Sequence, residues 1–288
     1  MNDQAASLRK LVEQQLHEEN NKSTRVITVT SGKGGVGKSN FSLNFALSLQ
    51  RLGKKVLLFD ADIGMANIDV LMGQSSPYNL YHLLTREKTI QEIIATGPEN
   101  LHYINGGSGV KDLLQLSPKQ LDIFTYEMSQ LHGLYDIILF DTGAGLSNET
   151  ARFVSASDET IVVTSPEPTA ITDAYALIKM LTSMRIKATF RLVVNRALDD
   201  REGERTMEKL QKVAAQFLQL EIPSLGIVPD DSFVSKAVRR QIPFILCFPN
   251  CPASRAIDQI AMSFLNMEQK SSLSGGIKGF FNKLFKIQ

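Results

Sequence analysis

The chain has 288 residues, of which 43% are hydrophobic, and this is enough for a sizeable core in one large domain. Its 31 basic side chains nearly balance its 30 acidic ones, so no global charge excess favours wrapping by nucleic acid. No apolar run approaches the roughly 18 residues that span a bilayer, and the N-terminus lacks a signal-peptide pattern, so we expect a cytoplasmic protein.

The first segment is predicted to be a short amphipathic helix. Residues 3–17 contain neither Gly nor Pro, and apolar side chains recur at helical spacing from Ala5 to Leu16. Residues 18–24 then form a polar linker. Because an isolated helix of this length is marginal in water, we expect it to order mainly on a partner. Docking as a lid on the chain's own domain is the alternative.

From residue 25 onward, β-branched runs alternate with helical stretches, which is typical of βαβ units. The predicted strands are 25–30, 55–59, 135–140, 159–164, 189–194 and 224–228. The predicted helices are 39–51, 118–132, 168–184, 203–219, 231–239 and 252–268. The continuous apolar runs within the strands suit burial on both faces of a sheet. We therefore predict an α/β domain over residues 25–268, with a mainly parallel central sheet flanked by helices.

The segment TSGKGGVGKS, residues 30–39, follows a predicted strand and opens a predicted helix, which is the context of a phosphate-binding Walker A loop. Glycines let backbone N–H groups converge on phosphate oxygens, Lys38 neutralises the β- and γ-phosphates, and Ser39 offers its hydroxyl to Mg²⁺. The residues predicted to contact the nucleotide here are Gly32, Lys33, Gly34, Gly35, Val36, Gly37, Lys38, Ser39 and Asn40.

The same loop also satisfies a dinucleotide-binding pattern. Three of its glycines have the required spacing, and Asp60 at the end of the next strand could imitate the acidic residue that holds a ribose. A Lys followed by a Ser is what a triphosphate with magnesium needs and a dinucleotide does not. The sequence therefore favours ATP or GTP over NAD.

Carboxylates follow two of the predicted strands at the edge of the sheet where α/β proteins bind ligands. Asp60 and Asp62 come after the strand 55–59, and for each of them the alternative is a loop-capping role. Asp141 ends the apolar run of the strand 135–140, as in a Walker B strand, and is expected to bind magnesium through water.

The last residues, 269–288, are a polar Ser- and Gly-rich linker followed by a basic amphipathic segment without acidic residues. Lysines lie largely apart from its apolar side chains, which suits a helix at a membrane surface. The apolar residues expected to enter the membrane are Ile277, Phe280, Phe281, Leu284 and Phe285. A terminal helix docked on its own domain is the alternative, and docking without ATP followed by release with ATP would serve both purposes.

The phosphate loop resembles that of the MinD and ParA ATPases, the deviant Walker A group, whose mark is a second lysine at the front of the loop, here Lys33. The resemblance covers about residues 25–268. It implies an ATP-dependent homodimer in which Lys33 reaches the nucleotide of the other subunit, with a solvated loop charge as the alternative. It further implies that Asp62 positions or activates the attacking water, while Asp60 supports the magnesium shell from one step further out.

The same resemblance extends to the base-binding side. Asn195 resembles the adenine-contacting Asn of the family, and Pro229 and Asp230 resemble its second adenine-side loop, although a turn explains those two nearly as well. The family usually has Pro where Gly143 stands. This departure makes the second switch loop more flexible and leaves the carboxylate of Asp141 in place.

The N-terminal heptapeptide DQAASLR resembles the DQAxxLR motif of the FlhG family, also called YlxH or FleN, whose members are MinD-like ATPases that regulate flagellar number and placement. The resemblance implies that residues 1–24 stimulate the SRP-type GTPase FlhF, that the ATPase engages flagellar switch-complex proteins, and that it associates reversibly with an anionic membrane surface. The residues that would contact FlhF are Asp3, Gln4, Leu8 and Arg9.

Two other functions stay open. A ParA-like partition ATPase would bind DNA non-specifically in its ATP state, although no specific nucleic acid is expected. An iron–sulfur scaffold of the same ATPase group would rest on Cys247 and Cys251, but two cysteines cannot complete a metal site unless two chains each donate a pair.

Overall fold

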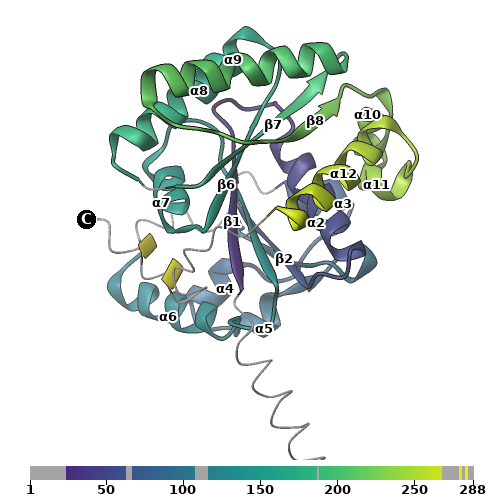
Figure 1. Cartoon of the computed structure of the whole chain (residues 1–288). Helices are drawn as coiled ribbons and strands as arrows, with labels where there is room; N and C mark the ends of the chain where they lie inside the picture. Colours follow the sequence, from purple (N-terminus) through teal and green to yellow (C-terminus); the bar gives the residue numbers. More distant parts are fainter. Residues whose placement is uncertain are drawn as a thin grey trace, which may run out of the picture.

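The computed structural model describes residues 24–62, 67–107, 116–186, 188–267, 279–280 and 283–284 (Figure 1). Its centre is an eight-stranded sheet in the order β3-β4-β2-β5-β1-β6-β7-β8. All neighbouring strands are parallel except β3 and β4, which are antiparallel. The strands are β1 Arg25–Thr30, β2 Val56–Ala61, β3 Ala95–Thr96, β4 His102–Asn105, β5 Ile137–Thr142, β6 Glu159–Thr164, β7 Phe190–Ala197 and β8 Ser224–Pro229. The predicted mainly parallel sheet is confirmed.

The helices also follow the predicted pattern. They are α2 Lys38–Arg51, α3 Ile68–Met72, α4 Leu80–Leu84, α5 Ile90–Ile93, α6 Pro118–Ser129, α7 Asn148–Ala156, α8 Pro168–Ser183, α9 Asp200–Leu218, α10 Ser232–Arg240, α11 Phe244–Cys247 and α12 Pro252–Asn266. Helix α9 begins three residues before the predicted start, because the side chain of Asp199 accepts a hydrogen bond from Glu202 N and caps the helix. The short elements β3, β4, α3, α4, α5, α7 and α11 were not predicted.

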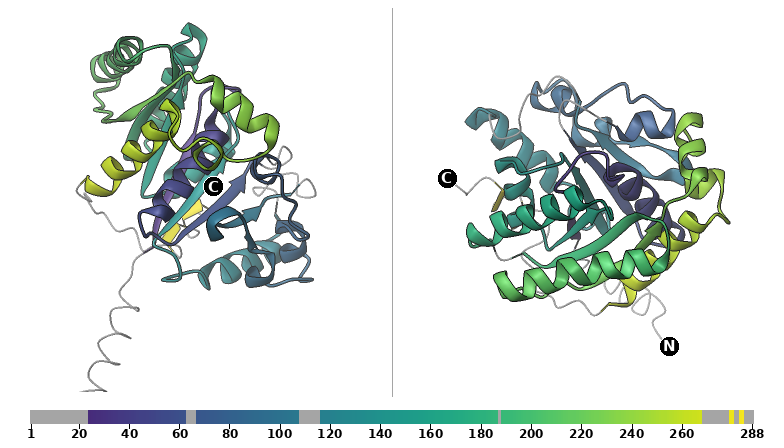
Figure 2. Two further views of the ribbon diagram at one scale, coloured as in Figure 1. Left: turned by 90° about the vertical axis from the view of Figure 1, so that its right-hand side faces the viewer. Right: turned by 90° about the horizontal axis from the view of Figure 1, so that it is seen from above.

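Alternate residues of each strand enter different hydrophobic clusters, as expected for a sheet that is buried on both faces. In β5, Ile137 and Leu139 pack with α2 and α12, whereas Ile138 and Phe140 pack with α4 to α7. A third cluster joins β6 and β7 to α8 and α9. The sheet therefore lies between helical layers (Figure 2).

Because the strands are parallel, the segments that follow β1, β2, β5, β7 and β8 all leave the sheet at its carboxyl edge. This edge is where the candidate site lies. Within the part of the chain that the structure describes, no helix is both long enough and apolar enough to cross a membrane.

Candidate nucleotide-binding site

The phosphate loop runs from the end of β1 into α2. At two of its positions only glycine fits, because a side chain would collide with neighbouring atoms. A Cβ atom on Gly37, whose φ is 89°, would lie 2.4 Å from Asn195 Nδ2. A Cβ atom on Gly32 would lie 2.2 Å from the backbone carbonyl carbon of Asp173. Without side chains there, the backbone N–H groups before α2 stay exposed at the positive end of the helix dipole, where phosphate oxygens bind.

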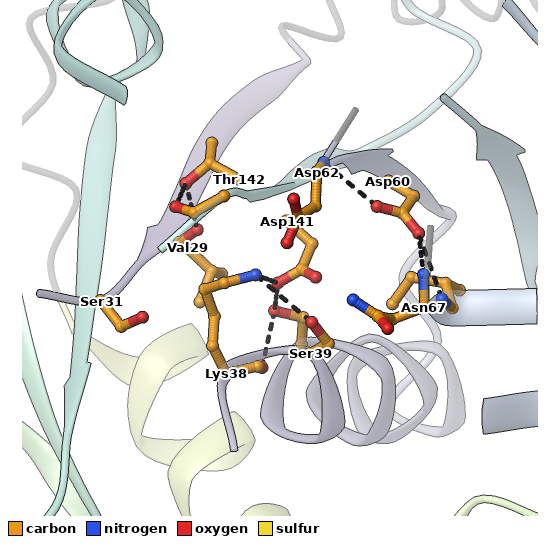
Figure 3. Close-up of polar contacts among 12 residues, drawn as sticks. Val29, Ser31, Lys38, Ser39, Asp60, Asp62, Asn67, Asp141 and Thr142 are labelled. Carbon is orange, nitrogen blue, oxygen red and sulfur yellow. Dashed lines mark hydrogen bonds and ion pairs between the residues drawn. The ribbon is translucent and has the colours of Figure 1, made fainter. Parts of the chain in front are cut away.

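Lys38, the first residue of α2, lies at the centre of a buried polar cluster (Figure 3). Its Nζ atom is 2.9 Å from Asp141 Oδ1 and 3.3 Å from Ser39 Oγ. Ser42 Oγ donates a second hydrogen bond to Asp141 Oδ1 at 2.6 Å. The lysine at the start of α2 and the carboxylate near the end of β5 are thus held together by direct contacts.

The residues of this cluster fit a magnesium ion. Asp141 Oδ2 is buried and has no hydrogen-bond partner among the described residues, so one carboxylate oxygen is available to a ligand. Carboxylate and hydroxyl oxygens are the groups that Mg²⁺ prefers, often through water. Ser39 and Asp141 would hold the ion, which would neutralise charge on the phosphates.

Asp60 has a different environment from that of Asp141. Its carboxylate accepts hydrogen bonds from the backbone N–H groups of Asn67 at 2.8 Å, Ile68 at 3.1 Å and Asp62 at 3.2 Å. Burial and the charge of Asp141 raise the pKa of Asp60 to about 7, while the three N–H groups oppose this rise. These contacts describe the loop-capping role that was the alternative, and a magnesium role for Asp60 stays a prediction.

Asp62 lies where the segments after β2 and β5 meet (Figure 3). It is half-buried, and its Oδ1 atom would be 3.5 Å from a Cβ atom on Gly143. Burial raises the pKa of Asp62, and the nearby charge of Lys38 lowers it. Gly145 N donates to Ser31 O at 2.8 Å, which ties the second switch segment to the phosphate loop. The role of Asp62 in orienting water toward a γ-phosphate stays a prediction.

Lys33 makes its contacts within its own chain. Its Nζ atom is 3.1 Å from Glu167 Oε2 and 2.8 Å from Thr169 Oγ1, at the start of α8. Both side chains of this ion pair are substantially exposed, so the ion pair contributes little free energy. Lys33 can therefore leave Glu167 for another anion at little cost in free energy. The role of Lys33 in a second subunit stays a prediction.

The predicted base-side residues come together around a hollow of about 390 Å³. Asn195, Pro229 and Asp230 line it, together with Arg196 and Asn40. Asn195 Nδ2 donates to Val36 O at 2.8 Å, which fastens β7 to the phosphate loop. Asn195 Oδ1 accepts no hydrogen bond from any residue that the structure describes, and an amide oxygen there would accept one from the amino group of adenine.

Other residues of the site were not predicted, because the sequence around them shows no motif or only a weak pattern. Ser42 follows Lys38 by one helical turn, so its place beside Lys38 could have been found from spacing, but its contact with Asp141, 99 residues away, could not. Glu167 and Thr169 are 134 and 136 residues from Lys33 and had no such signal. Arg196 has a φ of 62°, and its side chain approaches Gly35 O and Asp230.

The two cysteines make separate contacts. Cys247 Sγ lies 3.6 Å from an Arg240 guanidinium nitrogen, and the buried Cys251 Sγ lies 3.3 Å from Ser254 Oγ. No group of three or more His, Cys, Asp or Glu side chains that could hold a metal occurs among the described residues.

The C-terminal segment contacts the same strand that carries Asp141. Phe280 and Leu284 are buried in the cluster of α4 to α7, and Figure 1 shows their segments in yellow between α6 and α7. The ring of Phe280 stacks on Phe140, with centroids 4.8 Å apart and an angle of 13°. The other predicted membrane residues, Ile277, Phe281 and Phe285, lie outside the described residues, as do Asp3, Gln4, Leu8 and Arg9.

Comparison with known proteins agrees with this site. Residues 24–194 match the model of a family described as AAA domain. The flagellum site-determining protein YlxH of Helicobacter pylori is 40% identical, covering 99% of both chains. The antiactivator FleN of Pseudomonas aeruginosa is 36% identical over 90% of this chain and 93% of its own. The septum site-determining protein MinD of Pyrococcus horikoshii, solved with Mg-ADP, superposes with a TM-score of 0.67 at 26% identity, covering 84% of this chain and 96% of that one.

Proposed function

Because the chain belongs to the family of AAA-domain ATPases that includes YlxH, FleN and MinD, we propose that it is a Mg-ATP-dependent dimeric switch that regulates flagellar number and placement. The observation that carries the nucleotide part is the buried cluster of Lys38, Ser42 and Asp141, in which one carboxylate oxygen stays free for a ligand. Loss of Mg-ATP binding by the Lys38→Ala variant tests it.

Residues in and around the phosphate loop have separate steps in this proposal. A triphosphate draws the Nζ atom of Lys38 away from Asp141 and toward the β- and γ-phosphate oxygens. Asp141 is then free to help hold magnesium with Ser39. Asp62 orients the attacking water, and Lys33 leaves Glu167 to neutralise charge at the partner's nucleotide. Dimerisation completes the charge neutralisation and therefore precedes hydrolysis.

Reversible membrane association is the second part of the proposal. Burial of Phe280 and Leu284 stabilises the docked segment by about 1.5–3 kcal/mol per side chain, and the same side chains are the ones that a membrane would receive. Docking and lipid binding therefore compete. Since Phe140 stacks on Phe280 and directly precedes Asp141, a shift of β5 on nucleotide binding would reach the docked segment.

The dimer strengthens lipid binding without any new contact. The three lysines of residues 276–288, here called the tail, contribute about 3 kcal/mol to binding at an anionic surface. The cost of ordering a short Gly-containing helix offsets much of this free energy. One tail is thus expected to bind marginally. Two tails on one dimer raise the effective concentration for the second contact, so that ATP increases membrane binding.

A single tryptophan can report this release, because the chain has none of its own. We expect Phe280→Trp to emit at short wavelength without nucleotide and to shift to the red when Mg-ATP is added in an Asp62→Ala background. The reason is that the buried ring moves from Phe140 into water. Phe217→Trp, on the exposed surface of α9, is the matched control and should not shift.

Vesicle sedimentation completes this test. Deletion of residues 276–288 should abolish ATP-dependent sedimentation with anionic vesicles. Unchanged emission of Phe280→Trp on addition of ATP, or equal sedimentation of the truncated chain, would contradict the release of the tail.

The flagellar part of the proposal rests on the FleN and YlxH relatives and on the N-terminal heptapeptide. A GTPase poised for hydrolysis lacks only a group that orients water or neutralises charge. Gln4 suits the first role and Arg9 suits contact with an acidic surface. We propose that residues 1–24 act on FlhF in this way, and that switch-complex proteins are further partners.

A peptide of residues 1–20 is expected to accelerate GTP hydrolysis by FlhF. Gln4→Ala should remove most of the acceleration, and Gln14→Ala in the same peptide is the matched control. Deleting residues 1–23, which keeps the buried Thr24 and its hydrogen bonds with Tyr135 O and Gly133 N, should leave ATP hydrolysis by the rest of the chain nearly intact. No effect of the peptide on GTP hydrolysis, together with a lower melting temperature of the deleted chain, would instead identify the helix as a lid.

A further inference from the structure

Helix α10 packs on the hydrophobic core through Ala237 and the partly buried Val234, and most of its other side chains are exposed. Of its nine residues, only Ala237 is buried. Phe233 is 38% exposed, and Ile242 just beyond the helix is 42% exposed. Figure 1 shows α10 at the outer margin of the molecule beside α11. Single exposed apolar side chains are common, but here they share one short helix that contributes almost nothing to the core.

The same helix carries unbalanced positive charge. Lys236, Arg239 and Arg240 are exposed, and none of them forms an ion pair with a carboxylate of the described residues. From Ser232 to Ile257 the sequence has four basic residues and no acidic residue. These three cations are therefore available to carboxylates of another molecule.

Two of these cations lie over aromatic rings. Lys236 Nζ is 4.5 Å from the centroid of the Phe233 ring, and Arg240 Cζ is 5.3 Å from the centroid of Phe248. The acid that precedes the helix, Asp231, is occupied by hydrogen bonds from Phe233 N and Ala253 N. The result is a surface on which cations and apolar rings alternate.

Two residues at the C-terminal end of α10 connect this surface to the candidate nucleotide site. Arg239 lines the base-side hollow. Gln241, just beyond the helix, has its carbonyl oxygen 3.0 Å from where a Cβ atom on Gly73 would lie, and Gly73 caps the C-terminus of α3. Asp60 in turn holds the N-terminus of α3 through Ile68 N. A partner bound to α10 would therefore lie beside the base-side hollow and near α3.

We propose that the basic α10 surface, formed by Phe233, Lys236, Arg239, Arg240 and Ile242, docks an acidic amphipathic helix of another protein. Such a helix brings carboxylates to the three cations and an apolar stripe to the exposed rings and methyl groups. A nucleic acid backbone would neutralise the charge but leave Phe233 and Ile242 in water. A helix of about three turns matches the length of α10.

The test uses a labelled synthetic peptide of about three turns, with leucines at i, i+3 and i+4 spacing and glutamates on the other face. We expect it to bind the full chain, with an affinity that falls as salt is raised. Lys236→Glu combined with Arg240→Glu should weaken binding by about tenfold or more, since two attractive contacts become repulsive. Phe233→Ser combined with Ile242→Ser should also weaken it, because the apolar contact is lost while the charge remains.

Matched controls separate this surface from charge in general. Arg205→Glu combined with Lys209→Glu reverses two exposed cations at the same spacing on α9, and should leave peptide binding unchanged. ATP hydrolysis should be retained in all three double variants, so that a failure here is distinct from a failure of the proposed ATPase. Equal binding by Lys236→Glu/Arg240→Glu, or a DNA duplex that binds through these two cations and displaces the peptide, would overturn the proposal.

Discussion

The Asp62→Ala variant is expected to bind Mg-ATP almost as well as the native chain and to hydrolyse it at least about 100-fold more slowly. The carboxylate of Asp62 makes no hydrogen bond or ion pair with the described residues, so its loss leaves the phosphate loop intact. Its place between the segments after β2 and β5 suits the orientation of water, which only hydrolysis requires. Phosphate release at saturating ATP, with binding of a fluorescent ATP analogue, measures both properties.

The neighbouring carboxylate of Asp69 supplies the control for this variant. Asp69 accepts a hydrogen bond from Asn105 and lies on α3, outside the cluster around Lys38. Asp69→Asn should therefore keep both binding and turnover. If Asp62→Ala hydrolysed ATP at the native rate, Asp62 would have no role in positioning water.

Loss of nucleotide binding is the expected result for Lys38→Ala. Lys38 is almost fully buried beside Asp141, and without it the β- and γ-phosphate oxygens would lose the lysine charge that is proposed to neutralise them. Truncation of one partner in a buried charge pair costs about 2–5 kcal/mol, which corresponds to a loss of roughly 30- to 3,000-fold in affinity. Titration calorimetry with Mg-ATP measures the change.

Lys33→Ala is the matched control for Lys38→Ala, because both variants remove a lysine from the same loop. Lys33 pairs with the exposed Glu167 rather than with the buried cluster, so nucleotide affinity of the monomer should be nearly unchanged. A folded Lys38→Ala chain, verified by circular dichroism, that binds ATP with native affinity would exclude the proposed phosphate role of Lys38.

Local patterns in the sequence predicted the parts of the site that depend on neighbouring residues. The apolar run before Asp141 gave the strand, and the glycine spacing before Lys38 gave the phosphate loop with its helix. Their convergence followed from parallel strands ending at one edge. Short helices such as α3 could not be predicted, because five residues show too little periodicity.

Contacts between segments that are far apart in the chain could not be predicted from the sequence, for a different reason. The pairing of Lys33 with Glu167 depends on how α8 packs beside the phosphate loop, and no spacing encodes it. The apolar side chains of the C-terminal segment suit both a membrane and a protein groove, so Phe280 could not be assigned to Phe140 from pattern alone. The hydrogen bonds of Asp60 could not be predicted either, because they depend on where the folded chain places the backbone N–H groups of Asn67 and Ile68.

The central claim is that ATP joins two chains into one active dimer, and the mass of the Asp62→Ala chain in solution tests it most directly. Light scattering during gel filtration should give 31.9 kDa without nucleotide and about twice that mass with Mg-ATP. Adding Lys33→Ala to this variant should return the mass to that of one chain while ATP stays bound. An unchanged mass of 31.9 kDa for Asp62→Ala with ATP bound would contradict the claim.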